Sequence, residues 1–246
     1  MKGNLKKVGV VIAAFALAVT SLTTPATADA TTLTFAETHQ GGYGIKQVGP
    51  PWQNSGSLTQ LVLFRGLFKA NPDMTTVKPD LASSYKISKD GKTVTIKMKS
   101  GLKWSDGKAI TVDDVIWSIN SALRVTRINA NYSNAFKLID GASAVTASNK
   151  VNMSGLTAKG DEITIKLGAP QPLLIPILAQ FMILPKHVLD GEDVLRLETN
   201  KYWLNPVGSG PFKVETLNPD NFITLVQNAN YEGPKAKITK INVVAS

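Results

Sequence analysis

The stretch from Pro79 to Leu123, PDLASSYKISKDGKTVTIKMKSGLKWSDGKAITVDDVIWSINSAL, is the most informative part of this chain. Tyr85 and Ile87 alternate with polar residues before an Asp90-Gly91 turn, and apolar residues alternate again from Val94 to Met98. Period-2 patterning on both sides of an Asp-Gly pair predicts a β-hairpin, because hairpin turns favour residues that tolerate a positive φ.

A second turn and a capped helix follow the hairpin. Ser105-Asp106-Gly107-Lys108 carries the same Asp-Gly turn signal. Thr111 is a good N-cap residue, and Asp114 places an acid in the first turn, where the helix dipole favours negative charge. Apolar residues then recur at helical spacing; they are Val112, Val115, Ile116, Ile119 and Leu123. The sequence therefore predicts an amphipathic helix that begins after Thr111.

The remainder of the chain mixes strand and helix signals. Strands are predicted at 33–36, 162–167, 212–214, 222–226 and 238–243. A helix is predicted at 57–65, with Leu58, Leu61 and Val62 on one side and Gly66 as its stop. The segment 171–181 is predicted to start as a short helix and to be broken or kinked by its two prolines, and 129–141 to be loop with a short helix. These patterns predict a mixed α/β fold.

The first 30 residues have the composition of a secretory signal peptide. Lys2, Lys6 and Lys7 precede a 13-residue apolar stretch from Val8 to Thr20, and Ala28-Asp29-Ala30 forms an A-x-A cleavage site. Thirteen residues are too few to span a hydrocarbon core of about 30 Å as a helix. We predict cleavage after Ala30 and no stable membrane insertion afterwards. The alternative is that this segment is retained as a membrane anchor. Attachment through a lipid is excluded, because no cysteine lies near the cleavage point.

Composition argues against a nucleic-acid partner. The 246 residues include no cysteine, so the fold depends on its core rather than on disulfides. The formal charge of +9 falls to +7 when residues 1–30, with three Lys and one Asp, are removed. Lys97 and Lys99 alternate with apolar neighbours and are expected to face solvent. Such dispersed charges do not form the basic, aromatic-lined patch that binds nucleic acid.

No residue pattern points to catalysis or to a resident metal. Ser209 lies in Gly208-Ser209-Gly210, which lacks the G-x-S-x-G spacing of a nucleophile elbow. His39 and His187 are the only histidines and lie 148 positions apart, without an H-E-x-x-H motif. Asp113 and Asp114 are adjacent on the predicted helix and point in different directions. We predict no enzyme activity, no metal and no cofactor.

The stretch at 79–123 resembles the hallmark segment of the family-5 solute-binding proteins, the extracytoplasmic receptors of peptide, opine and nickel ABC importers. Four further segments resemble family motifs: LFRGLF at 63–68, ILPKHVL at 183–189, PVGSGPF at 206–212 and NANYEGP at 228–234. Arg65 stands where the family usually has an acid, and Glu232 where it has tryptophan. The similarity is nearly continuous from Leu33 to Val244.

This resemblance implies a periplasmic-binding-protein-like fold of type II. Residues 31–56 and 160–246 would form parts of lobe one, and residues 57–159 the extra subdomain inserted in it. Family members continue beyond the position of Ser246 into a second lobe, so that lobe is expected to be absent from this chain.

The implied function is to bind a peptide-like solute in the periplasm and to deliver it to the permease subunits of an ABC importer. Dipeptide, oligopeptide, opine, sugar and metal chelate all remain open as ligands. Two alternatives also remain open. The first is a truncated scaffold or protein-interaction module without transport, and the second is an exported hydrolase, for which the sequence shows no nucleophile–base pair.

The ligand-binding residues implied by the resemblance lie in two regions. They are Trp52, Gln53, Asn54, Ser55, Gly56 and Ser57 after the first strand, and Tyr132 beyond the hallmark helix. Trp52 would supply a flat apolar wall, and Asn54, Ser55 and Ser57 would supply hydrogen bonds to peptide backbone. The alternative is that Trp52 packs beside Pro51 and the polar residues cap the following helix.

Cleavage after Ala30 is directly testable. Protein recovered from the periplasm is expected to begin at Thr31 and to have the intact mass of Thr31–Ser246. Replacing the small residue at the cleavage point, Ala30→Leu, is expected to block or shift processing, whereas Asp29→Ala is not. An uncleaved wild-type chain that stays in the membrane fraction would favour the anchor instead.

Overall fold

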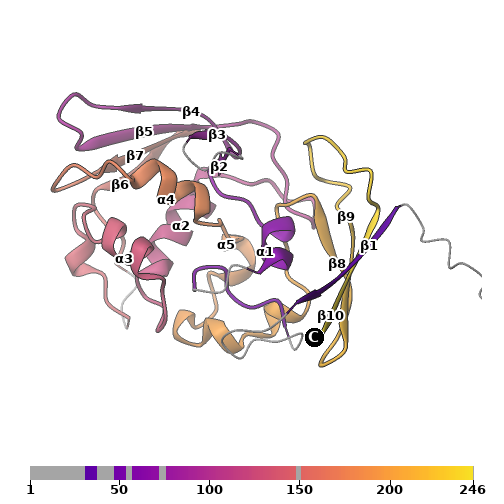
Figure 1. Ribbon diagram of the computed structural model, residues 1–246. Coiled ribbons are helices and arrows are strands. Elements are labelled where there is room, and N and C mark those ends of the chain that lie inside the picture. The colour runs from indigo at the N-terminus through magenta and orange to yellow at the C-terminus, as the bar shows by residue number, and fades with distance from the viewer. Residues whose placement is uncertain (1–30, 38–46, 54–56, 72–75, 148–150, 246) are drawn as a thin grey trace, which may run out of the picture.

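The computed structural model describes residues 31–37, 47–53, 57–71, 76–147 and 151–245. Two four-stranded sheets form its framework. Figure 1 shows one sheet at the upper left and the other at the right, with most helices between and below them. One continuous cluster of buried apolar side chains joins the two parts. The mixed α/β class predicted from the sequence is confirmed.

The first sheet, called here the main sheet, has the strand order β1-β10-β9-β8. Its strands are β1 (Thr32–Glu37), β8 (Phe212–Asn218), β9 (Phe222–Gln227) and β10 (Lys240–Ala245). β1 is parallel to β10, with Phe35 opposite Val243, and the other neighbours are antiparallel. All four strands were predicted, although β8 is longer than expected and β10 begins two residues late.

The second sheet, called here the hairpin sheet, is antiparallel with the order β4-β5-β7-β6. Its strands are β4 (Ala82–Ile87), β5 (Thr93–Met98), β6 (Leu156–Lys159) and β7 (Glu162–Lys166), and a small ladder of β2 (Phe68–Ala70) and β3 (Val77–Pro79) lies beside it. The predicted hairpin is confirmed: Gly91 has φ +68°, and alternate residues of β5 are buried. The predicted domain boundary between residues 159 and 160 falls in the turn that joins the paired strands β6 and β7. This boundary stays a prediction.

Helix α2 (Val112–Ala122) begins where the sequence predicted, and Asp114 does more than cap it. The Asp114 carboxylate accepts hydrogen bonds from the backbone N–H of Thr111 (2.8 Å), from the backbone N–H of Lys186 (2.9 Å) and from Trp104 Nε1 (3.3 Å). Burial raises the pKa of Asp114, although these three bonds favour its charged form. One carboxylate thus ties the start of α2 to two other segments.

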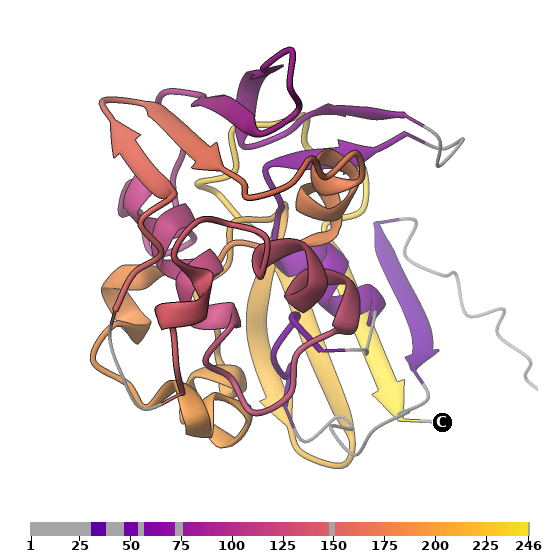
Figure 2. The ribbon, with the colours of Figure 1, turned by 90° about the vertical axis from the view of Figure 1, so that its left-hand side faces the viewer.

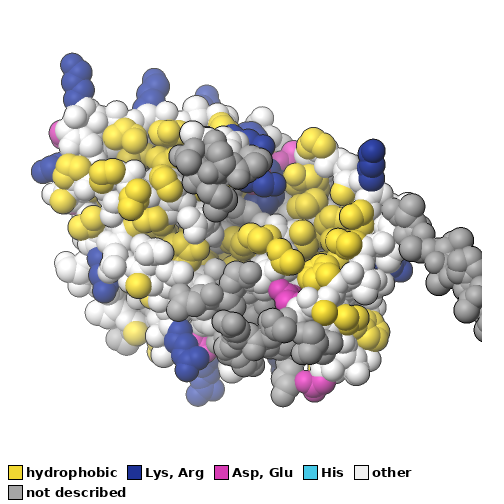
Figure 3. Space-filling view, viewed as in Figure 1, with side chains coloured by type: hydrophobic (Ala, Val, Ile, Leu, Met, Phe, Trp, Pro, Cys, Tyr) yellow, Lys and Arg dark blue, Asp and Glu magenta, His cyan; other side chains and the backbone are white. Residues whose placement is uncertain are grey.

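Helix α1 (Leu58–Leu63) differs from its prediction in length and in the face that it buries. It ends at Leu63 rather than Arg65. Leu58 and Leu61 are each 56% exposed, and hydrophobic side chains gather on this side of the molecule (Figure 3). Its buried face carries Gln60, whose side chain donates to the backbone oxygens of Val48 and Gly49, both at 3.1 Å. Thr59 and the apolar Leu63 are also buried on this face. Gln60 points inward because its side chain satisfies carbonyl groups of an irregular segment.

The remaining helices are short. They are α3 (Ala130–Phe136), α4 (Leu174–Gln180), α5 (Lys186–Leu189) and the 3₁₀ segments η1 (Ala142–Ala144), η2 (Val194–Thr199) and η3 (Lys201–Leu204). Figure 2 shows α3 and neighbouring segments in front of β8–β10. The predicted break in 171–181 is wrong. Pro172 precedes the N-cap residue Leu173, and Pro176 lies in the first turn of α4, where a backbone N–H has no helical partner.

Asp114→Asn is expected to destabilise the fold by about 2 kcal/mol, because the amide nitrogen would face N–H donors that now bind a carboxylate. Asp113→Asn is the matched control, since the Asp113 side chain is 66% exposed and lies 3.8 Å from Lys186 Nζ. Urea unfolding followed by circular dichroism measures both free energies. Equal, small losses for the two variants would show that Asp114 does not hold the three segments together.

Candidate functional site

The two regions predicted to bind ligand lie side by side in the structure. The backbone N–H of Asn129, which is the N-cap of α3, donates to the backbone oxygen of Trp52 at 2.9 Å. Tyr132 follows in the first turn of α3. The rings of Trp52 and Tyr132 both pack on Phe181, with centroid distances of 5.4 Å and 5.3 Å. Phe181 was not among the predicted residues, although it is the contact that they share.

Both predicted aromatic side chains are buried. Trp52 is 1% exposed, and its Nε1 donates to the backbone oxygen of Met182 at 2.8 Å. Tyr132 is 7% exposed, and its hydroxyl donates to the backbone oxygen of Gln180 at 3.0 Å. Burial raises the pKa of Tyr132. Trp52, Trp117, Tyr132, Phe136 and Phe181 form an aromatic cluster.

The aromatic cluster positions the segment around Trp52 rather than presenting a free aromatic surface. The indole ring of Trp52 stacks on Phe181 with an interplanar angle of 14°, and it also contacts Trp117 at a centroid distance of 6.2 Å. The packing alternative left open by the sequence therefore describes the ring in this structure, with Phe181 as the main neighbour. A direct contact between Trp52 or Tyr132 and a ligand stays a prediction.

Two polar residues of the first region, Gln53 and Ser57, have hydrogen-bond partners in the structure. Gln53 Nε2 donates to the carboxylate of Glu198 in η2, and Gln47 Nε2 donates to the backbone oxygen of Glu198 at 2.7 Å. Ser57 is the N-cap of α1, and its Oγ accepts from the backbone N–H of Gln60 at 3.4 Å. Asn54, Ser55 and Gly56 lie outside the described residues. No motif in the sequence pointed to Glu198, because 145 residues separate it from Gln53.

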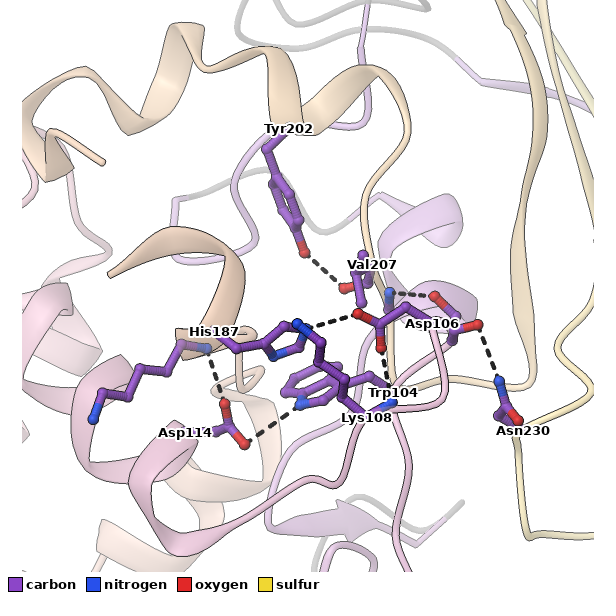
Figure 4. A network of polar contacts seen from close by, with 11 residues as sticks. Trp104, Asp106, Lys108, Asp114, His187, Tyr202, Val207 and Asn230 are labelled. Atoms are coloured by element: carbon purple, nitrogen blue, oxygen red, sulfur yellow. Dashed lines mark hydrogen bonds and ion pairs between the residues drawn. The ribbon is translucent and has the colours of Figure 1, made fainter. Parts of the chain in front are cut away.

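A polar network surrounds the second Asp-Gly turn (Figure 4). His187 Nε2 lies 2.7 Å from Asp106 Oδ2, and the backbone N–H of Lys108 donates to Asp106 Oδ1 at 3.1 Å. Partial burial opposes the charge of Asp106, but the hydrogen bonds from His187 and Lys108 outweigh it and lower the pKa of Asp106. His187 is partly buried beside Trp104. Among the described residues, no group of His, Asp and Glu side chains is arranged to hold a metal ion.

Through Ser105, the same turn is joined to the segments just before β8 and just after β9. Its backbone N–H donates to Gly208 O at 2.8 Å, and its Oγ accepts from Gly208 N–H at 3.1 Å. Asn230 Nδ2 donates to the backbone oxygen of Ser105 at 3.1 Å. Ser209 is fully buried, and its Oγ accepts from the backbone N–H of Arg65 at 3.0 Å. Ser209 thus has a structural role here, and a hydroxyl in this position is not accessible to a substrate.

Comparison with known proteins establishes the family. Residues 76–246 match the sequence profile of the bacterial extracellular solute-binding proteins, family 5 Middle, and the chain belongs to this family. A Brucella ovis protein that carries the name ABC transporter peptide-binding protein is 29% identical over 215 residues, which are 84% of this chain and 38% of the relative. The oligopeptide-binding protein OppA of Bacillus subtilis is 30% identical over 189 residues, 74% of this chain and 33% of OppA.

Solved structures support the same fold. The crystal structure of NikZ from Campylobacter jejuni in complex with Ni(L-His) superposes with a TM-score of 0.69 at 25% identity, covering 87% of this chain and 39% of NikZ. The expected family and the periplasmic-binding-protein fold are confirmed. The chain spans well under half the length of these relatives. No helix in the described part of the chain is both long enough and apolar enough to cross a membrane.

The lowered pKa of Asp106 predicts an acid-dependent loss of stability. A carboxyl group with a folded-state pKa below 3.8 stabilises the fold above pH 3.8, and this contribution disappears as the pH falls through the folded-state pKa. Asp106→Asn is expected to cost on the order of 1 kcal/mol at pH 6 and much less near pH 2.5. Melting temperatures across this range measure the difference.

Asp161→Asn serves as the control for this experiment. The Asp161 side chain is 61% exposed and lies 3.6 Å from Lys97 Nζ, so its ion pair contributes little at any pH. A difference between wild type and Asp106→Asn that stays constant from pH 6 to about pH 2.5 would contradict the prediction.

Proposed function

We propose that this chain forms the part of a periplasmic receptor that binds a peptide-like solute and delivers it to the permease subunits of an ABC importer. The observation that carries the proposal is the hydrogen bond from Asn129 to the backbone of Trp52, which holds the two regions implied by the family resemblance together. Membership of a solute-binding family supports the same function. Delivery to the periplasm by a signal peptide cleaved after Ala30 is part of the proposal.

The aromatic cluster and the residues beside it suggest how such a lobe works. Trp52 is fixed by packing and Gln53 by Glu198 on one side, and Ser57 is fixed by α1 on the other. Because Gln53 and Ser57 are already fixed, these two residues lose less entropy when a ligand binds beside them. Asn54 and Ser55 lie between these two residues in the sequence and are proposed to hydrogen-bond the ligand backbone. Backbone recognition of this kind reads few side chains and suits varied peptides.

Affinity is expected to depend on a second surface. Closure of a receptor of this type buries the ligand between two lobes that each contact it more strongly in the closed state. Because the chain matches only about a third of the length of OppA, we propose that this lobe alone binds peptides weakly. The receptor performs no reaction, and a buried Ser209 supports this part of the proposal.

Saturable binding of radiolabelled peptides to the purified chain tests the function. Probes would range from a dipeptide to a nonapeptide, with an opine and a nickel–histidine chelate as competing classes. The double variant Asn54→Ala/Ser55→Ala is expected to bind about tenfold more weakly, because two hydrogen bonds are lost. Asn221→Ala/Ser83→Ala is the matched control, with both exposed residues on other parts of the fold.

The outcomes separate the candidate functions. Binding that is weakened only by the Asn54/Ser55 variant supports the receptor. Absence of saturable binding up to about 10 mM of every probe would favour a scaffold or interaction module without transport. Turnover of a chromogenic ester or peptide would instead indicate a hydrolase.

A further inference from the structure

An exposed apolar area lies where the edge strand β4 meets the segment that leads into α4. Tyr85 and Ile87 on β4 are 42% and 49% exposed, and Leu173, the N-cap residue of α4, is 61% exposed. These three side chains are called here the apolar patch. Figure 3 shows hydrophobic side chains gathered over this part of the molecule. Exposed apolar residues are common one by one, whereas a group of large ones marks an interaction surface.

Packing beneath the apolar patch holds its members near one another. A Cβ atom on Gly91, in the turn after β4, would lie 3.1 Å from Pro170 Cβ, and Leu173 follows three residues later. On the other side, the ring of Tyr85 meets Phe68 of β2 edge to face, with a centroid distance of 5.2 Å. β2 in turn packs against α4. The patch is therefore formed by packed strands and a helix start.

Four exposed lysines, called here the border lysines, lie on two sides of the apolar patch. Lys89 and Lys92 flank the hairpin turn, and Lys69 stands directly opposite Lys78 in the β2–β3 ladder. Like charges at opposite positions of two strands repel each other. Neither Lys69 nor Lys78 forms an ion pair with a carboxylate in the described part of the chain. An external anion would relieve this repulsion.

Carboxylates are few around the apolar patch. The chain has no Asp or Glu from 163 to 189, the part that contains α4. In the described residues from β2 to the hairpin turn there are two, and both are already used. Asp80 bonds to Arg65 at 2.5 Å, and Asp90 accepts hydrogen bonds within its own turn; Asp73 lies outside the described residues. The surface is therefore net positive and complements an anionic partner.

The exposed apolar side chains of α1 lack this charge. Leu58 and Leu61 are as exposed as those of the patch, but residues 57–63 include no Lys or Arg. Glu37 accepts a hydrogen bond from the backbone N–H of Leu58 at 2.9 Å and so places a negative charge beside the start of α1. An anionic partner therefore favours the patch beside β4 over α1.

We propose that the apolar patch and the border lysines dock on an anionic phospholipid bilayer. The ammonium groups of the lysines contact lipid phosphates, and the three apolar side chains enter the boundary between headgroups and acyl chains. Binding of this kind depends jointly on the apolar area that is buried and on attraction to anionic lipids. The contact is peripheral, and it does not depend on the proposed binding of peptides.

Cosedimentation with lipid vesicles tests the docking. The protein used begins at Thr31, because the apolar stretch 8–20 would bind lipid by itself. It is expected to bind vesicles of phosphatidylglycerol, which are anionic, and not vesicles of phosphatidylcholine. Binding is expected to weaken as the salt concentration rises from about 0.05 M to about 0.5 M, because salt screens the attraction between lysines and phosphates.

A charge variant tests the border lysines. Lys69→Gln/Lys78→Gln is expected to weaken binding to phosphatidylglycerol vesicles about tenfold. The same variant is expected not to lower the melting temperature, because it removes a repulsive pair. Lys235→Gln/Lys237→Gln is the matched control, since it removes two exposed lysines from the segment after β9.

A second variant tests the apolar patch. Leu173→Ser is expected to weaken vesicle binding severalfold, because one exposed leucine no longer enters the bilayer. Serine is a favourable N-cap residue, so α4 is expected to keep its start. Leu204→Ser is the matched control, because Leu204 is 44% exposed and lies in η3.

Several results would overturn the proposal. One is wild-type protein that does not bind phosphatidylglycerol vesicles, or that binds both lipids equally. Another is equal weakening by the two lysine pairs, which would show attraction of the whole basic chain rather than of this surface. Dimers that form without lipid and that Leu173→Ser dissociates would assign the patch to a second copy of the chain. Failure of peptide binding leaves the proposal standing, because the vesicle assay contains no peptide.

Discussion

The backbone around Gly208 and Gly210 lies directly against the end of α1. A Cβ atom on Gly208 would come within 2.2 Å of Leu63 O, and one on Gly210 within 2.2 Å of Val62 O. No side chain larger than hydrogen fits at either place. Because the same segment also bonds to Ser105, this contact sets the distance between the main sheet, α1 and the second Asp-Gly turn. The contact reaches the start of α2 as well, because Trp104, which precedes Ser105, donates to Asp114.

Ion pairs of Arg65 also stabilise the region that the two glycines bring into contact. Arg65 is 7% exposed, and its guanidinium bonds to Asp80 Oδ1 at 2.5 Å and to Glu232 Oε1 at 2.8 Å. Burial opposes the charge of Arg65, but the two carboxylates outweigh burial and raise its pKa. In the sequence, Arg65 and Glu232 are two unrelated departures from the family pattern. In the structure they are partners, and the loss of one would leave a buried charge uncompensated.

Local features of the fold could be predicted because their causes lie within a few residues. The Asp90-Gly91 hairpin and the start of α2 depend on nearest neighbours, and both are confirmed. The buried face of α1 could not be predicted, because Gln60 is drawn inward by carbonyl groups of an irregular segment. For the candidate site, the family resemblance implied the two regions, and the structure brings them together. Their burial depends on Phe181, a distant residue with no motif of its own.

The aromatic cluster and the end of α2 differ in how completely their buried polar groups are hydrogen-bonded. In the aromatic cluster, Trp52 Nε1 and the Tyr132 hydroxyl both donate to backbone oxygens, so this core gains nothing by opening toward a ligand. The ligand contacts proposed above would then lie at the margin of the cluster, beside Gln53, which Glu198 holds. At the end of α2, by contrast, Ser121 Oγ and Arg124 Nε are unpaired in the described part of the chain, but both atoms are buried away from solvent. These two unpaired groups therefore lower the stability of the fold without offering a contact to a ligand in this conformation.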